Sequence, residues 1–297
     1  MRVAVVDVGS NTARVLVADV FPDGRVEAVE ERRERLGLGA EIAARGALSR
    51  DTVGVVARAC KGYAKLARAL GVERAETIVT APGRQGREPQ RLVSALSDAT
   101  RLPVRVLSSD EEGRLSYVGA VARAASSPGL TAVVDVGGGS TEIVLGDRWR
   151  GPVWIRSIDL GSIRLTRQYL RRDPPGRREL RSARDAVRDG TAGLEPSRPD
   201  RALATGGSAR AIAKIVGPVF DAEDVESAVD TFTRRSSAKV ARAAGIHPVR
   251  AASVLGGALL LSETSRLLDR PLELARGGVR EGAALALAGV QSSAAAA

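Results

Sequence analysis

Two segments of the chain combine an aspartate, glycines and hydroxyl side chains in nearly the same order. The first segment, residues 3–20, contains Asp7, Gly9, Ser10, Asn11 and Thr12. The second segment, residues 131–146, contains Asp135, Gly137, Gly138, Gly139, Ser140 and Thr141. Glycine lets backbone N–H groups approach an anion, hydroxyl groups add donors, and an aspartate can hold a magnesium ion that bridges phosphate oxygens. The two segments therefore predict phosphate-binding loops.

An ordinary hairpin turn is the alternative for each loop, because Asn, Asp, Gly and Ser are common turn residues. The repetition favours phosphate binding, since a plain turn needs no matching aspartate. Arg14 follows the first loop on the strand face of Leu16 and Ala18, where a buried guanidinium needs an anionic partner. A hydrated strand face would accommodate Arg14 equally well, and this alternative stays open.

Each loop joins two β-branched stretches, so each is expected to connect two strands. Asp7 and Asp135 are 128 residues apart, about one domain length, and this repeat predicts two similar domains. We place the first domain at residues 1–125 and the second at residues 126–297. The last helix could instead pack back on the first domain, and residues 291–297 are expected to be a disordered tail. A third glycine cluster contains Gly207 and Ser208; it joins a short apolar stretch to a helical pattern and predicts another anion contact.

Composition narrows the function classes. The 297 residues include one Cys and one His, which excludes a disulfide framework, a Cys/His zinc site and an evident Ser-His-Asp triad. No signal peptide and no membrane-spanning stretch is recognisable, so we expect a cytoplasmic protein without a membrane partner. The formal net charge of +10 fits attraction to a polyanion, but 41 of the 45 basic residues are Arg, as GC-rich coding also produces.

Four motifs occur in the order and spacing of one family. They are Asp7-Val8-Gly9-Ser10-Asn11-Thr12, Ser108 to Leu115, Asp135 to Glu142, and Gly161 to Thr166. The chain resembles the exopolyphosphatase and guanosine pentaphosphatase family, in its short two-domain form, within the superfamily of actin, heat-shock ATPases and sugar kinases. The resemblance runs from Arg2 to about Gly282.

The resemblance implies an α/β fold with two ribonuclease-H-like domains and the active site in the cleft between them. By position, Glu112 matches the catalytic glutamate, Arg84 a phosphate-binding arginine, and Asp135 and Glu142 the metal-associated acids. The implied cofactor is Mg²⁺, or Mn²⁺ in its place. The implied substrate is inorganic polyphosphate or guanosine pentaphosphate; we do not expect nucleic acid as a partner, and a homodimer is considered. Pro82-Gly83 before Arg84 and Ala252 after Arg250-Ala251 depart from the family pattern, and so does Arg167, where many relatives have glutamate.

Hydrolysis of a phosphoanhydride needs a positioned water, neutralised charge and an in-line leaving group. Glu112 would accept the proton of the water, while Arg84, Arg14 and the loops would neutralise phosphate oxygens. From local sequence alone, Glu112 is better explained by a capping box with Ser109 at the start of a helix. A small-molecule kinase and a non-catalytic sensor of alarmones or RNA are the alternatives of other classes.

Overall fold

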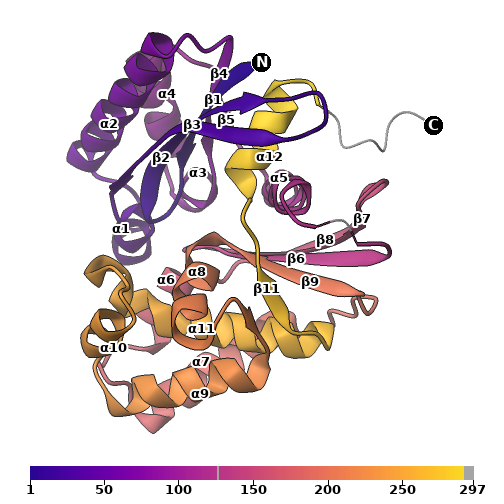
Figure 1. The fold of residues 1–297 in the computed structure, drawn as a ribbon. Coiled ribbons are helices and arrows are strands. Elements are labelled where there is room, and N and C mark those ends of the chain that lie inside the picture. The colour runs from indigo at the N-terminus through magenta and orange to yellow at the C-terminus, as the bar shows by residue number, and fades with distance from the viewer. Residues whose placement is uncertain (126, 291–297) are drawn as a thin grey trace. The chain divides into compact units, whose positions relative to one another are not determined.

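The computed structural model describes residues 1–125 and 127–290, so the tail predicted at 291–297 lies outside the described residues. The chain divides into two compact units (Figure 1). Unit 1 comprises Met1–Ala124, Trp149–Gly151 and the described residues from Gly277 to Val290, and unit 2 comprises Ala125–Arg148 and Pro152–Arg276. Each unit is an α/β structure built on its own sheet.

Unit 1 contains a five-stranded sheet in the order β3-β2-β1-β4-β5. Its strands are β1 (Arg2–Val8), β2 (Thr12–Val20), β3 (Val26–Arg35), β4 (Arg74–Val79) and β5 (Val104–Val106). Its helices are α1 (Leu38–Arg45), α2 (Arg50–Ala69), α3 (Ala81–Gln85), α4 (Pro89–Thr100), α5 (Ser109–Ala122) and α12 (Val279–Leu287). The β1–β2 pair is antiparallel, whereas β4 runs parallel to both β1 and β5.

Helices cover both faces of this sheet, which explains why β1 is apolar at nearly every position. Ala4, Val6 and Val8 pack with buried residues of α2 and α4 on one face. Val3 and Val5 pack with residues of α12 on the other face (Figure 1). Helices α5 and α12 approach so closely that a Cβ on Gly282 would lie 2.0 Å from the Leu115 carbonyl oxygen.

Unit 2 contains a six-stranded sheet in the order β10-β11-β9-β6-β7-β8. Its strands are β6 (Leu130–Val136), β7 (Thr141–Asp147), β8 (Gly151–Ile158), β9 (Arg201–Thr205), β10 (Val219–Phe220) and β11 (Leu272–Leu274). Its helices are α6 (Ser162–Tyr169), α7 (Arg177–Thr191), α8 (Gly206–Val216), α9 (Ala222–Arg234), α10 (Ser237–Ala243) and α11 (Pro248–Leu268). Helix α11 lies in the core and contacts α6, α7, α8, α9 and α10.

The two sheets share one topology. Strands β6, β7, β8, β9 and β11 repeat the arrangement of β1 to β5, with an antiparallel hairpin followed by two parallel neighbours. This is the ribonuclease-H-like order, and it confirms the α/β fold that the family resemblance implied. The predicted phosphate loops join β1 to β2 and β6 to β7, so they occupy equivalent places in the two units.

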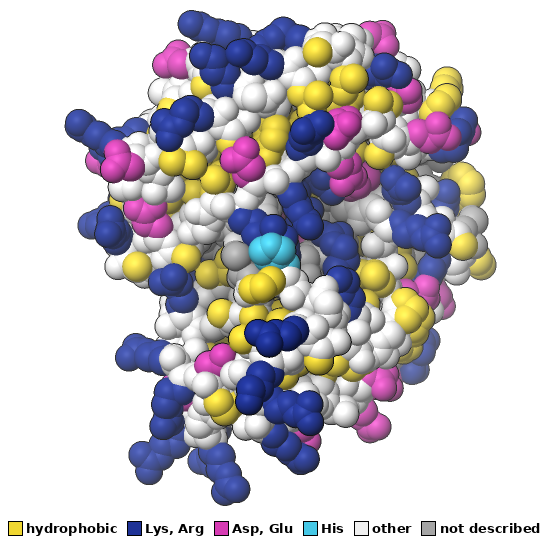
Figure 2. Space-filling view, turned by 60° about the vertical axis from the view of Figure 1, so that its left-hand side comes forward, with side chains coloured by type: hydrophobic (Ala, Val, Ile, Leu, Met, Phe, Trp, Pro, Cys, Tyr) yellow, Lys and Arg dark blue, Asp and Glu magenta, His cyan; other side chains and the backbone are white. Residues whose placement is uncertain are grey.

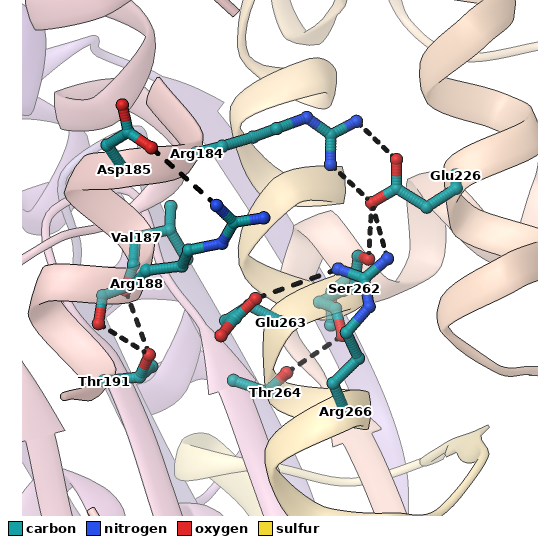
Figure 3. A network of polar contacts seen from close by, with 11 residues as sticks. Arg184, Asp185, Val187, Arg188, Thr191, Glu226, Ser262, Glu263, Thr264 and Arg266 are labelled. Carbon is teal, nitrogen blue, oxygen red and sulfur yellow. Dashed lines mark hydrogen bonds and ion pairs between the residues drawn. The ribbon is translucent and has the colours of Figure 1, made fainter. Parts of the chain in front are cut away.

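A half-buried carboxylate joins three helices of unit 2 (Figure 3). Glu226 of α9 accepts hydrogen bonds from Arg184 of α7 and, at 2.8 Å, from the Ser262 hydroxyl of α11. Arg266 of α11 donates to it at 3.1 Å. Burial by itself raises the pKa of Glu226, but the hydrogen bonds and charges of Arg184 and Arg266, with Ser262, outweigh it and lower the pKa to about 2.

This lowered pKa makes the stability of unit 2 depend on pH in a defined window. The ionised carboxylate stabilises the fold fully above its ordinary pKa of 4.5, and the contribution is lost as pH falls toward about 2. We expect Glu226→Gln to lower the free energy of unfolding at pH 7 by about 2 kcal/mol, because Arg184 loses its anionic partner and Arg266 keeps, among the described residues, only its pair with Glu263. Denaturant unfolding between pH 7 and 2.5 measures this, and the deficit should shrink below pH 4.5.

Glu223→Gln is the matched control, since Glu223 is an exposed carboxylate on the same helix. Its free energy of unfolding should stay within about 0.5 kcal/mol of the original protein. An equal loss in both variants, or a Glu226→Gln deficit that does not change with pH, would contradict the assigned role of Glu226.

Candidate functional site

In unit 1, the β1–β2 loop is held from two sides by backbone hydrogen bonds. The Gly39 N–H donates to the Ser10 carbonyl at 2.7 Å, and the Leu36 N–H donates to the Asn11 carbonyl at 3.0 Å. A Cβ on Gly39 would lie only 2.7 Å from the Ser10 Cβ, so the close approach requires glycine there. Gly9 closes the turn by donating to the Thr12 carbonyl at 3.0 Å. The loop is thus fixed in shape before any ligand binds.

Arg14 lies directly opposite Asp7 in the β1–β2 register, and its Nε donates to the Thr12 hydroxyl at 3.2 Å. The structure therefore brings Arg14, Asp7 and the loop together at one end of the hairpin. Ser10 and Thr12 are both buried, with exposed fractions of 6% and 8%. Their hydroxyl groups consequently lie below the surface of the unit.

Glu112 and Arg84 form an ion pair within unit 1. The Arg84 Nη2 lies 2.8 Å from the Glu112 Oε2, and the Arg84 Nη1 donates to the Leu107 carbonyl at 2.7 Å. Glu112 is buried at 8% exposure although it lies in the first turn of α5. The sequence did not predict this direct pair, because α3 and α5 meet only in the folded unit.

The capping role belongs to the neighbouring residues. The Glu111 N–H donates to the Ser108 hydroxyl at 3.1 Å, and the Ser108 N–H donates to the Glu111 carboxylate at 2.8 Å. The capping box suggested for Ser109 and Glu112 is therefore wrong by one residue. A structural explanation of Glu112 as a helix cap no longer applies, and its carboxylate is oriented toward Arg84 instead.

In unit 2, Asp135 and Glu142 lie opposite each other in the β6–β7 register. Directly opposed residues of an antiparallel pair have their side chains on the same face. Asp135 is 9% exposed and Glu142 is fully buried, with its Oε1 accepting a 3.0 Å hydrogen bond from the Ser157 hydroxyl. Two buried carboxylates side by side repel each other, and a divalent cation or a bound cationic group offsets that cost.

The β6–β7 loop rests on the start of α6. The N–H groups of Ser162, Ile163 and Arg164 donate to the carbonyls of Gly137 and Gly138 at 2.9 to 3.2 Å. A Cβ on Gly161 would lie 2.5 Å from the Gly139 nitrogen, so the loop and the helix are in tight contact. These contacts use loop carbonyls and so fix the orientation of the peptide units from Gly137 to Ser140.

Thr141 is fully buried, and its hydroxyl donates to the Leu160 carbonyl at 2.8 Å. Its hydroxyl hydrogen is thus used inside the unit, which favours a role in shaping the hairpin over donation to a phosphate. Ser140, at 3% exposure, lies beside it in the same loop.

The third glycine cluster lies next to Asp135. Strand β9 runs parallel to β6 with Thr205 in register with Asp135, and Gly206 has a positive φ of 86°. A Cβ on Gly206 would lie 2.6 Å from the Asp135 Oδ1, so only glycine fits between β9 and this carboxylate. Gly206 is the first residue of α8, and Gly207 and Ser208 follow it in the same turn, close to Asp135.

Two further arginines lie beside predicted site residues, and the sequence did not predict either of them as part of a site. The Arg250 guanidinium lies so close to Gly207 that a Cβ there would be 2.0 Å from it. In unit 1, Arg35 lies in register with Thr12, and its buried Nε has no hydrogen-bond partner among the described residues. Burial, and then the charge of Arg33, lower the pKa of Arg35. No local pattern distinguishes Arg35 from the other charged residues of β3.

A divalent-metal site was predicted at Asp135 and Glu142. Within residues 1–125 and 127–290, no group of three or more His, Cys, Asp or Glu side chains could hold a metal ion. Two opposed carboxylates still suit magnesium, which is often bound through one or two carboxylates together with water and substrate phosphates. The donor set therefore fits a magnesium ion that shares its coordination with a phosphate ligand.

Comparison with known proteins gives the family. The model of the Ppx/GppA phosphatase family matches residues 16–289. The chain belongs to this family. Exopolyphosphatase 2 of Mycobacterium tuberculosis is 31% identical over 97% of this chain and 99% of that protein. Exopolyphosphatase 1 of the same organism is 26% identical over 95% of this chain and 87% of that protein.

Solved structures of the family agree with the fold. The Ppx/GppA family member of Aquifex aeolicus superposes with a TM-score of 0.82 at 25% identity, over 96% of this chain and 97% of that one. An exopolyphosphatase from Cytophaga hutchinsonii superposes with a TM-score of 0.87 at 19% identity, over 98% and 99% of the two chains. No helix among the described residues is long and apolar enough to span a membrane.

Proposed function

We propose that this protein is an exopolyphosphatase, a hydrolase that releases phosphate from inorganic polyphosphate. The family match over residues 16–289, with relatives named exopolyphosphatase that align over nearly their whole length, carries this proposal. The buried acid pair and the two fixed loops support it, because phosphoanhydride hydrolysis needs positioned anion contacts and charge neutralisation. Cytoplasmic location and a homodimer stay predictions.

In this proposal, Glu112 accepts the proton of the attacking water and Arg84 contacts the phosphate being released. Backbone and hydroxyl donors of Gly9 to Thr12 and of Gly137 to Ser140 hold phosphate oxygens, as do Arg14, Gly207 and Ser208. Asp135 and Glu142 would hold Mg²⁺, or Mn²⁺ in its place. When bound, this ion supplies charge neutralisation on the phosphate oxygens.

Phosphate release from long-chain polyphosphate, guanosine pentaphosphate and ATP, measured side by side, tests the proposal. We expect release from polyphosphate to be fastest, to require Mg²⁺ or Mn²⁺, and to stop with chelator. Faster release from guanosine pentaphosphate would assign the chain to that activity of the family instead. Full activity in chelator, or no release from any substrate, would reject the proposal.

We also infer that Arg35 contacts the substrate beside the β1–β2 loop. Its buried Nε lacks a partner among the described residues, and a bound phosphate would provide one. Arg35→Gln should raise KM for polyphosphate about tenfold and leave kcat nearly unchanged. A contact that binds the substrate and the transition state equally affects KM alone. Thermal unfolding should show no loss of stability, because the variant removes a charge that burial disfavours.

Arg32→Gln is the control for this substitution. Arg32 is exposed on β3 and pairs only with Glu30 at 3.2 Å among the described residues. KM should stay within about twofold in that variant, as for most surface charges. Equal KM values for the two variants would remove Arg35 from the binding site.

A further inference from the structure

Basic residues are concentrated in two segments of unit 2. Residues 167–188 contain eight arginines and three acids, and residues 234–242 contain four basic residues and no acid, in a chain with a net charge of +10. The basic charge of the chain is therefore unevenly placed. GC-rich coding alone would favour Arg over Lys, but it would not gather the excess charge in two segments.

The fold brings the two segments together. The first segment forms the end of α6, a turn and α7; the second runs from the end of α9 into α10. The Ser237 N–H, at the start of α10, donates to the Asp173 carboxylate of the turn at 2.7 Å. The lower part of Figure 1 contains α7, α9 and α10, and many Lys and Arg side chains project from the lower part of Figure 2.

We name this surface the α7 patch. It consists of Arg171, Arg177, Arg178, Arg181, Arg234 and Arg235, all of them exposed. Neighbouring arginines have acidic partners: Arg172 pairs with Glu179, and Arg184 with Glu226. The six patch side chains make no hydrogen bond or ion pair with any residue that the structure describes. Their positive charges are therefore not paired with any described acid, and a polyanion would pair with them.

The spacing of the patch suits a chain of closely spaced negative charges. Arg177, Arg178 and Arg181 occur on consecutive turns of α7, within about 6 Å along the helix axis. Arg234 and Arg235 extend the charge to the end of α9. Several adjacent guanidinium groups bind a multivalent chain by releasing its counterions, whereas a single phosphate gains little from them.

Nucleic acid is a poorer match for the same surface. Proteins that bind single strands without sequence preference combine basic grooves with exposed aromatic side chains for base stacking. The two segments contain one aromatic residue, Tyr169, which packs against the core. Phe232, two residues before the second segment, is fully buried. The patch offers charge without a stacking surface, and this favours a polyanion that has no bases.

We propose that the α7 patch is a secondary binding site for the polyphosphate chain, which gives the enzyme higher affinity for long chains than for short ones. This inference rests on the proposed exopolyphosphatase function. The patch residues do not take part in the chemistry, so they act on KM through substrate length and leave kcat unchanged.

The test replaces Arg177, Arg178 and Arg181 with glutamine in the full chain. The matched control replaces Arg58, Lys61 and Lys65, three exposed basic residues of helix α2 in unit 1, also with glutamine. We expect the patch variant to raise KM for long-chain polyphosphate about tenfold, because several weak, solvent-screened charge contacts are lost together. Its KM for tripolyphosphate should stay within about twofold of the original value. The control should leave both KM values within about twofold, and the salt dependence of KM for the long chain should be weaker in the patch variant only.

Direct binding separates this inference from the proposed function. Labelled long-chain polyphosphate is titrated into the protein in chelator, where no turnover is expected. Weaker binding by the patch variant but not by the control supports the patch, even if the original protein releases no phosphate and the proposed function fails. Equal binding by all three proteins, an equal rise of KM for both substrates, or displacement of polyphosphate by lower concentrations of a single-stranded RNA would overturn the inference.

Discussion

Glu112→Gln is expected to lower kcat for polyphosphate by about 10²–10⁴, because glutamine keeps the length and hydrogen-bonding capacity of the side chain but cannot accept a proton from water. The measurement is kcat at saturating substrate, with thermal unfolding recorded in parallel. The variant should remain folded, since its amide oxygen can still accept a hydrogen bond from Arg84, which is 2.8 Å from the carboxylate.

Glu111→Gln gives the matched control for this experiment. Glu111 is the preceding residue in the same helical turn, and its carboxylate completes the capping box with Ser108. Glutamine can occupy that position, so stability should fall by about 1 kcal/mol at most and kcat should be retained. The contrast between two adjacent glutamates separates loss of proton transfer from loss of helix capping.

The Arg84–Glu112 ion pair offers one competing explanation of Glu112. If Glu112 only positions Arg84, glutamine preserves most of that contact, and the variant should show a raised KM with kcat within about threefold of the original. A kcat that is retained in this way would contradict the assignment of Glu112 as the general base. A loss of kcat with an unchanged thermal midpoint would support it.

The sequence predicted the parts of the fold that depend on local patterns. The β-branched stretches around Asp7 and Asp135 form hairpins with the expected loops, and both sheets repeat one strand order. Strand periodicity and turn composition are properties of a few neighbouring residues, so a single sequence reveals them.

Features that depend on distant contacts were not predictable. Ser108-Ser109-Asp110-Glu111-Glu112 contains two overlapping capping-box spacings, and local sequence does not decide between them. The decision comes from packing, because only one register exposes the capping glutamate and turns the next one toward Arg84. Arg35 and Arg250 approach Thr12 and Gly207 through contacts across β-strands and between helices, and neither lies in a glycine-rich loop.

Asp135→Asn should abolish most activity and weaken metal binding together. We expect kcat/KM for polyphosphate to fall by about 10³. The Asp135 carboxylate would hold the ion that both neutralises the phosphate charge and positions the substrate. Asparagine is nearly isosteric with aspartate, so the 2.6 Å approach that requires glycine at position 206 stays compatible with the variant. Folding should therefore be preserved, and the loss should come from charge alone.

A second readout does not depend on activity. A metal ion that binds the folded state raises the unfolding temperature by mass action, so a titration with Mg²⁺ reports the affinity of the site in the absence of substrate. The original protein should show a rise of a few degrees, and Asp135→Asn should need at least about tenfold more Mg²⁺ for the same rise.

Asp147→Asn is the control, because Asp147 ends the same hairpin at the other side, in register with Leu130. The substitution is the same and lies in the same hairpin, but Asp147 is five residue pairs away from the pair that contains Asp135, and it lies outside the loop. If both variants shift the Mg²⁺ titration equally, the effect is a general one of hairpin charge and the acid pair is not the metal site. If Asp135→Asn loses activity while its Mg²⁺ response is unchanged, Asp135 acts on the substrate without holding the ion. Loss of both properties in Asp135→Asn alone is the outcome that two opposed, buried carboxylates at a phosphate loop predict.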